Sequence, residues 1–231
     1  MIFAIVTQAA GRKGVGLLAS LFRRPAAVRN RTDLVNHLIG KHGFQRYLEI
    51  GVRHPRHNFN KIRAPHKDGV DPSPRGRISH TMTSDDFFAR LRHDPNHPPY
   101  DVILVDGLHL AEQVERDIVN GLAHLSSGGY IVVHDCNPPT EDAQTDHYDG
   151  KKDWNGTVWK AWAKLRATRP DLSMWVVDAD QGCGVIRRGS QICFPLPEEL
   201  LDAGRLAYGY LVEHRQALLN LISVQDFLAL E

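Results

Sequence analysis

The chain has 231 residues and a formal net charge of +1, and this length is enough for one domain with a substantial core. Hydrophobic residues make up 42% and charged residues 24%, proportions typical of a globular domain in water. The small net charge excludes a general attraction to nucleic acid or to a membrane surface. Its 3 cysteines form no C-x-x-C pair, which argues against a disulfide framework or structural zinc and favours a cytoplasmic location.

The N-terminal residues 1–24 are fairly apolar, but Arg12 and Lys13 interrupt them. The remaining apolar pieces are too short to cross a bilayer. A secretory signal carries its basic residues before the apolar run, whereas here they come after it. We expect a peripheral helix here and no stable membrane insertion.

The first hundred residues predict two helices and two strands. Capping and periodicity predict the helices, and short apolar runs predict the strands. Thr32 or Asp33 is the expected cap of the first helix, and Ser84 or Asp85 that of the second. The expected elements are a helix over 32–43, a strand over 46–52, a weaker strand over 67–73 and a helix over 84–93.

The second half of the chain continues the alternation of strands and helices. Its strands are continuous apolar runs, as in parallel sheets buried on both faces. A short turn between the last two strands predicts an antiparallel hairpin. In order we expect a strand over 100–107, a helix over 110–125, a turn at 126–129, a strand over 130–135, a polar loop over 136–155, a helix over 156–170, strands over 173–180 and 182–189, and a helical region over 197–222.

This alternation predicts an α/β fold with a Rossmann-like, doubly wound and mostly parallel sheet that ends in an antiparallel hairpin. We expect a single domain over 1–231. It comprises an N-terminal helical segment (1–43), an α/β core (44–189) and a C-terminal helical segment (190–231). Open sheets of this type bind ligands beyond the carboxyl ends of their strands. The polar residues at these ends are Glu49, Gly51, Asp71, Asp106, His134 and Asp135, and we expect them to share one rim.

The first strand ends in a motif E-x-G, made by Glu49 and Gly51. Arg53 and Arg56 replace the later glycines of a dinucleotide fingerprint, which weakens a pyrophosphate-binding interpretation. Asp71 ends the next strand, where an acid can accept hydrogen bonds from a ribose diol. Alternatively, Glu49 caps a helix and Asp71 starts a turn; in this order the two acids favour an adenosine-containing ligand.

The third and fourth strands end in ionisable groups. Asp106 is a candidate metal ligand, base or helix cap, and His109 is a candidate general base whose pKa a helix N-terminus would lower. His134 and Asp135 would point to opposite faces if the strand continued, so they can act together only where it turns. Asp106 and Asp135, together with His134 or Asn137, form a candidate Mg²⁺ site, and the alternative is a hydrogen-bonded pair that orients the loop.

The pattern "YLEIG…GVDPS…TSDDFF…YDVILVDGLH…LSSGGYIVVHDCNPPT" resembles the class I S-adenosylmethionine-dependent methyltransferases. It is most similar to the group near the macrocin-type and catechol-type O-methyltransferases. The resemblance covers roughly residues 44 to 188, and its most specific part is "DGLH" followed by "GGYIVVHDCNPPT".

The resemblance implies a role for each matching position. Glu49, Gly51 and Asp106 would lie beside the cofactor, Asp71 would bind the ribose hydroxyls, and Ser84 or Asp85 would lie near the adenine. Asp106 and Asp135 match positions that bind Mg²⁺ in metal-dependent members. His134 replaces an aspartate of the macrocin-type enzymes, and His109 matches the general base. The chain lacks the second glycine of the cofactor turn, so His54 and Pro55 must give this turn another shape.

The resemblance implies O-methylation of a small-molecule acceptor, such as a sugar or a secondary metabolite, with S-adenosylmethionine as cofactor and Mg²⁺ as a candidate second one. The expected catalytic residues are His109, Asp106 and His134. We expect no nucleic-acid partner, and the apolar N-terminal and C-terminal segments are candidate homodimer interfaces. The alternatives are a nucleotide-dependent oxidoreductase, a metal-dependent hydrolase and a non-catalytic nucleotide-binding protein on the same fold.

Overall fold

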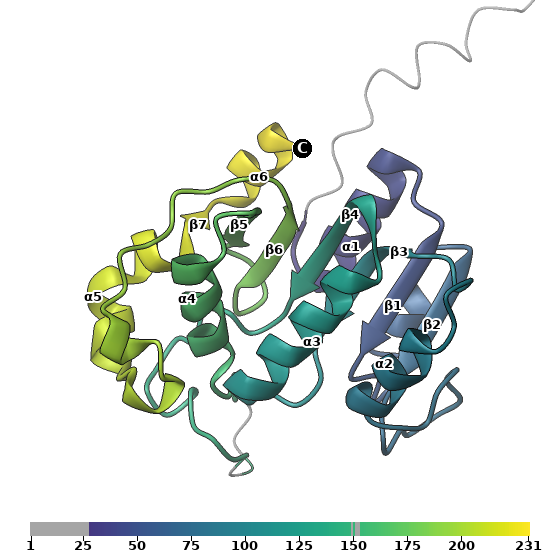
Figure 1. Cartoon of the computed structure of the whole chain (residues 1–231), viewed down its shortest axis with the longest axis horizontal. Coiled ribbons are helices and arrows are strands. Elements are labelled where there is room, and N and C mark those ends of the chain that lie inside the picture. The colour runs from purple at the N-terminus through teal and green to yellow at the C-terminus, as the bar shows by residue number, and fades with distance from the viewer. Residues whose placement is uncertain (1–27, 149, 151–152) are drawn as a thin grey trace, which may run out of the picture.

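The computed structural model describes residues 28–148, 150 and 153–231 (Figure 1). The helix expected over 1–24 lies outside these residues. The helices are α1 (Arg31–His42), α2 (Ser84–Arg92), α3 (Ala111–Ala123), α4 (Val158–Thr168), α5 (Tyr208–Leu219) and α6 (Val224–Leu230), with 3-10 turns at Phe59–Lys61, Glu198–Leu200 and Ala203–Arg205. The strands are β1 (Arg46–Ile50), β2 (His66–Val70), β3 (Tyr100–Val105), β4 (Leu125–Val133), β5 (Leu172–Val177), β6 (Cys183–Arg188) and β7 (Leu221–Ile222).

The strands form one sheet in the order β2-β1-β3-β4-β6-β5-β7. β6 runs antiparallel to both of its neighbours, and the other pairs are parallel. The predicted fold class and the β5–β6 hairpin are therefore confirmed. The chain leaves β1 toward β2 on one side and continues through β3 and β4 on the other, so the topological switch point lies between β1 and β3, where open α/β sheets bind ligands.

Two apolar clusters cover the two faces of the sheet. Residues alternate between them along each strand, as the period of a strand requires. Ile103 belongs to the cluster that contains α2, α3 and α4, whereas Val102 and Leu104 belong to the cluster that contains α1 and α6. Trp159 and Trp162 of α4 are fully buried in the first cluster. This double cover explains why the central strands are apolar throughout.

The structure corrects several element boundaries. The turn expected at 126–129 is part of β4, where the register with β3 shifts between Tyr100 and Val102. A side chain at Gly129 would lie 2.7 Å from the carbonyl oxygen of Asp101, so a glycine is needed for close strand packing there. The C-terminal segment is not wholly helical, because β7 adds an edge strand beside β5.

The two predicted N-terminal caps are also shifted. Asn30 rather than Thr32 or Asp33 caps α1, and Thr83 rather than Ser84 or Asp85 caps α2. In each case a side-chain oxygen one or two residues earlier accepts a backbone N–H of the first turn. Among the described residues, the helices are all too short or too polar to pass through a bilayer.

Candidate active site

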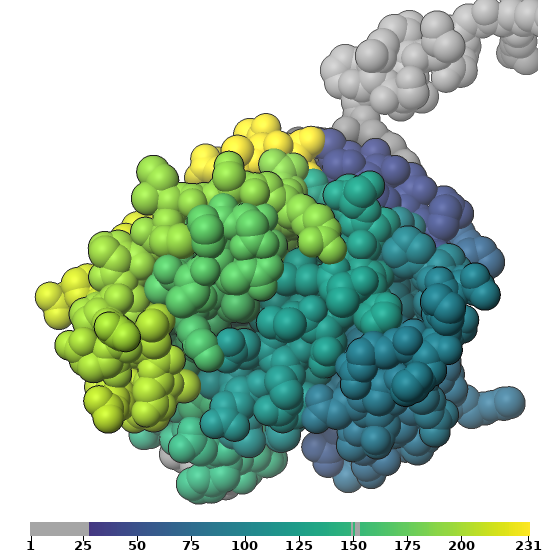
Figure 2. All heavy atoms as spheres, in the orientation of Figure 1, coloured from purple at the N-terminus to yellow at the C-terminus, as the bar shows by residue number. Residues whose placement is uncertain are grey.

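A cavity of about 610 Å³ opens at the carboxyl ends of β1, β2 and β3. In Figure 1 these ends point toward the lower edge of the molecule, where the loop after β4 also lies. The space-filling view shows the segments after β2 and after β4 bordering the same lower edge (Figure 2). The predicted residues that line the cavity are Glu49, Gly51, Asp71, Ser84, Asp85, Asp106 and His109.

Gly51 lies at the switch point and has a φ of 98°, in the left-handed region that favours glycine. A Cβ at this position would overlap the backbone carbonyl of Asp106. The backbone N–H of Asp106 donates to the backbone carbonyl of Ile50, so a hydrogen bond joins the ends of β1 and β3. Gly51 is therefore required by the approach of two strand ends.

The expected alternative shape of the cofactor turn is visible after Gly51. The N–H of His57 donates to the carbonyl of His54, and the N–H of Asn60 donates to the carbonyl of Pro55. Pro55 is buried, whereas Arg53 is exposed. His54 and Pro55 thus form the bend that the missing second glycine would otherwise allow.

Glu49 is buried beneath this turn and is 3% exposed. Its Oε2 accepts hydrogen bonds from the Tyr47 hydroxyl at 2.7 Å and from the Asn58 amide at 2.8 Å. Burial raises the pKa of Glu49 to about 7, even though these two hydrogen bonds favour the carboxylate. The floor of the cavity therefore holds a carboxyl group that changes charge near neutral pH.

Asp71 follows β2 directly and is 8% exposed. Its Oδ1 accepts the N–H of Ser73 at 2.7 Å, which fixes the carboxylate at the cavity wall. At the next wall, the Gln113 amide donates to Ser84, Asp85 and the buried Asp117. The acids expected to contact a ribose and an adenine thus border one continuous surface.

Beside the cavity lies a group of ionisable side chains, which we call the acid–imidazole cluster: Arg31, Asp106, His109, His134, Asp135 and Asp180. The Nδ1 of His134 lies 3.2 Å from Asp106 Oδ1 and 3.1 Å from Asp135 Oδ2. His109 contacts the same two acids, at 3.5 Å and 3.3 Å. His134 and Asp135 are buried and do not line the cavity; Asp106 and His109 connect them to it.

The chain turns between His134 and Asp135, as their cooperation requires. β4 ends at Val133, and Asp135 has a φ of 64° in the left-handed region. This turn brings both side chains to the same side. The amide of Asn155 donates to Asp135 Oδ1 at 2.9 Å and holds the carboxylate in place.

Charge within the cluster decides the protonation of its histidines. Burial lowers the pKa of His109, but the hydrogen bond to Asp106 and the charge of Asp135 outweigh it, so the pKa is raised. The prediction that a helix N-terminus lowers this pKa is therefore wrong. Burial likewise opposes the charged form of His134, yet the Asp106 and Asp135 charges raise its pKa well above the ordinary value. Asp106 shows the reverse effect: its pKa is well below the ordinary value because the charge of His134, the hydrogen bond from His109 and the charge of Arg31 outweigh burial.

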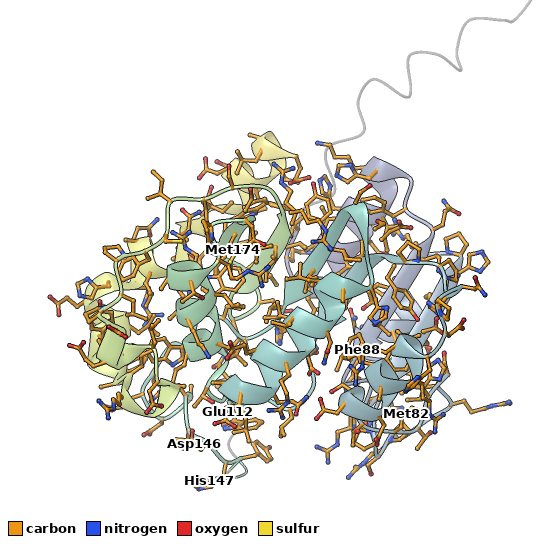
Figure 3. All side chains as sticks on the ribbon, in the orientation of Figure 1. Met82, Phe88, Glu112, Asp146, His147 and Met174 are labelled. Carbon is orange, nitrogen blue, oxygen red and sulfur yellow. The ribbon has the colours of Figure 1, made fainter. Side chains whose placement is uncertain are left out.

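His109 is held in place from the loop after β4. The indole of Trp154 stacks on its ring with centroids 5.1 Å apart, and the backbone carbonyl of His109 accepts the N–H of Thr157. Tyr148 contacts Trp154, with the two ring centroids 5.6 Å apart. Figure 3 shows Asp146 and His147 at the outer edge of this loop, beyond Glu112 at the start of α3. Tyr148 and Trp154 of this loop line the cavity together with His109.

The sequence does not indicate Arg31 and Asp180 of the cluster, nor Asn155, which holds Asp135 in place. Arg31 begins α1 and reaches Asp106 Oδ2 at 3.1 Å and Asp180 Oδ2 at 3.0 Å. Asp180 lies in the β5–β6 turn, far along the chain from Arg31. No local motif marks these residues, since folding alone brings them together.

A sequence model of a family described as a methyltransferase domain matches residues 20–136, just over half of the chain. No curated protein sequence matches it. Among known structures, the O-methyltransferase TomG from Streptomyces achromogenes, in complex with SAM, is 15% identical, with 77% of this chain and 92% of that chain covered and a TM-score of 0.51. The SAH-bound methyltransferase PaMTH1 from Podospora anserina is 16% identical, with 75% and 86% covered and a TM-score of 0.50.

These structural similarities confirm the fold, and the family match covers β1 to β4 together with the strand ends that form the cavity. The predicted membership rests on the same segments, from the E-x-G turn to "VVHDC". The chain belongs to the methyltransferase-domain family and has the Rossmann-like fold of the class I methyltransferases.

Proposed function

We propose that this chain transfers a methyl group from S-adenosylmethionine to an oxygen atom of a small molecule. The observation that carries the proposal is the cavity at the switch point of the sheet, which Glu49, Gly51, Asp71 and Asp85 line together. The cavity volume of about 610 Å³ lies in the range of small-molecule sites. Asp106 and His109 border the same space, so an acceptor can lie beside the cofactor.

The cofactor contacts follow from the charges along the wall. Glu49 is placed to receive the ammonium group of the methionine part, and Asp71 the ribose hydroxyls. Ser84 and Asp85, held by Gln113, border the region left for the adenine. The sulfonium brings its own leaving group, so the protein needs to align the acceptor oxygen with the methyl and remove its proton. His109 is the proposed base.

The residues of the cluster fit a divalent metal ion. One ligand atom each from Asp106, His134 and Asp135 lies within 4.8 Å of the others. The Nδ1 atoms of His109 and His134 are buried and make no hydrogen bond within the described part of the chain. Asp106, Asp135 and His134 would hold the ion, which when bound lowers the pKa of an acceptor hydroxyl. Asp106 orients His109, which takes the proton.

The Asp71→Ala variant should bind S-adenosylmethionine about 1–3 kcal/mol more weakly, the usual cost of losing a hydrogen bond to a charged group. Asp71→Asn is the matched control, because it keeps an oxygen for the N–H of Ser73 and loses only the charge. Its affinity should lie between those of the wild type and the alanine variant. Calorimetric titration measures all three, and an unchanged affinity in Asp71→Ala would remove the ribose assignment.

Cofactor affinity should rise with pH through the pKa of Glu49, which is about 7. Below this value the carboxyl group is protonated and has no charge for the ammonium group, so binding at pH 6 should be about tenfold weaker than at pH 8. Titrations with metal-free protein across this range measure the effect. The Glu49→Gln variant should show a flatter profile. An identical profile in variant and wild type would exclude Glu49 as the cause.

Methyl transfer itself is tested by incubating the protein with methyl-labelled S-adenosylmethionine and a panel of hydroxylated sugars, phenols and other metabolites. Label in an acceptor, together with S-adenosylhomocysteine, supports the proposal. Binding without transfer to any acceptor favours the alternative of a non-catalytic nucleotide-binding protein. If the protein hydrolysed an ester in the presence of a metal ion and without S-adenosylmethionine, the metal-dependent hydrolase would be favoured. We further propose that the protein is located in the cytoplasm and has no nucleic-acid partner. We also propose that it forms a homodimer, and sedimentation of the purified protein would test this oligomeric state.

A further inference from the structure

His134 differs from His109, the other imidazole of the cluster, because its ring nitrogens face three carboxylates rather than two. Nδ1 lies 3.2 Å from Asp106 and 3.1 Å from Asp135, and Nε2 lies 3.3 Å from Asp180 Oδ2. The side chain is almost fully buried. We call the side of the ring with Nδ1, which faces Asp106 and Asp135, its inner edge. We call the side with Nε2, which faces Asp180 in the β5–β6 turn, its outer edge.

The inner edge has the spacing of a coordination shell. Neighbouring ligands of an octahedral ion with bonds of about 2.1 Å lie about 3 Å apart, close to the separations of His134 Nδ1 from Asp106 and Asp135. Nδ1 is buried and makes no hydrogen bond to any described residue. A nitrogen that lies this close to two carboxylate oxygens is placed to share a cation with them.

The outer edge holds the imidazole ring in one orientation. Nε2 of His134 lies 3.2 Å from the guanidinium Nη1 of Arg31 and 3.3 Å from Asp180 Oδ2. Asp180 Oδ2 also accepts from the guanidinium of Arg31 at 3.0 Å and from the backbone N–H of Arg31 at 3.0 Å. Asp180 is thus held beside Nε2 and becomes the acceptor of an Nε2–H when a metal ion takes the lone pair of Nδ1. Histidine ligands commonly donate their second N–H to a carboxylate, which orients the ring and leaves the other nitrogen lone pair for the metal.

The cluster holds more carboxylates than permanent cations. Asp106, Asp135 and Asp180 share one guanidinium, that of Arg31, which contacts Asp106 and Asp180. A metal ion and a proton are alternatives at Nδ1 of His134, because coordination uses the lone pair of the nitrogen. A divalent ion between Asp106 and Asp135 would take the place of that proton.

We propose that Asp180 and Arg31 set His134 as a nitrogen ligand, and that the site therefore prefers a first-row transition ion over Mg²⁺. The reason is the ligand set: imidazole suits transition ions, whereas Mg²⁺ takes oxygen ligands almost throughout. The inference rests on the metal site of the proposed function and assigns its selectivity. Asp180 and Arg31 are positioning residues, since they act through His134.

Metal binding to the purified, metal-stripped full chain tests the selectivity without any acceptor. Calorimetry with Mn²⁺, Co²⁺ and Mg²⁺ should show both transition ions binding on the order of tenfold or more tightly than Mg²⁺. The His134→Asp variant supplies an oxygen ligand and should bring the affinities closer together. The visible absorption of bound Co²⁺ should change in this variant. Equal affinities in the wild type, or a Co²⁺ spectrum that His134→Asp leaves unchanged, would overturn the proposal.

The Asp180→Asn variant tests the outer edge of His134 independently. It keeps the proposal testable if the His134→Asp variant does not fold. An amide at this position keeps the size of the side chain but loses its charge, and Mn²⁺ affinity should fall about 10–100-fold. Asp180 does not line the cavity, so affinity for S-adenosylmethionine should be retained. Unchanged Mn²⁺ affinity would overturn the role of Asp180. Wild-type protein that binds S-adenosylmethionine but none of the metals contradicts this inference alone, whereas absent cofactor binding contradicts the proposed function.

Discussion

The Gly51→Ala variant is expected to lose about 3–5 kcal/mol of stability, the range for a strained backbone combined with a steric clash in the core. Gly51 has a φ of 98°, which an alanine adopts only with strain. The added Cβ would overlap the carbonyl of Asp106 and lie 2.6 Å from the Cα of Gly107. Both partners are backbone, so neither can rotate away. The ends of β1 and β3 would have to separate, which would also distort the cofactor cavity.

Urea unfolding measures this loss, and Gly40→Ala is the matched control. Gly40 lies inside α1, and a Cβ there would meet no atom within 4 Å. The control should be neutral or up to about 1 kcal/mol more stable, because alanine favours a helix over glycine. If Gly51→Ala unfolded at the same urea concentration as the wild type, the close approach of the two strand ends would be refuted.

Replacing His109 with alanine should lower turnover about 10²–10⁴-fold, the usual contribution of a general base. His109 borders the cavity, and Asp106, Trp154 and Thr157 hold it in one orientation. The substitution leaves the proposed cofactor contacts of Glu49 and Asp71 in place, so the affinity for S-adenosylmethionine should be retained. Initial rates with an acceptor from the labelling screen, together with cofactor titrations, separate the two effects.

The control for this prediction is His93→Ala, an exposed histidine at the end of α2 that does not line the cavity. It should leave both turnover and cofactor affinity unchanged. Full activity in His109→Ala would eliminate His109 as the base. A loss of cofactor affinity equal to the loss of rate would instead assign it to binding.

The fold and the cavity rim were predictable because their signals are local. An apolar run that stops at a polar residue marks both a strand and its carboxyl end, and Glu49, Asp71 and Asp106 lie at such ends and line the cavity. The order of β1 to β4 follows from strand and helix alternation. β7 escaped prediction because its two residues have no period of their own and form a strand only by pairing with β5.

The electrostatics of the site was not predictable in the same way. The pKa direction of His109 depends on Asp135 as well as Asp106, and the orientation of His134 depends on Asp180. Arg31 and Asp180 meet because the start of α1 packs on the β5–β6 turn. Such contacts follow from tertiary packing and leave no spacing in the sequence.

Calorimetric titration of the metal-stripped protein with S-adenosylmethionine, with NAD⁺ as the control ligand, tests the central claim most directly. We predict one site with an affinity on the order of micromolar, about −8 kcal/mol, and no heat with NAD⁺. Absence of heat with S-adenosylmethionine in a folded sample would contradict the methyltransferase assignment of the cavity. Heat with NAD⁺ instead would favour the oxidoreductase alternative.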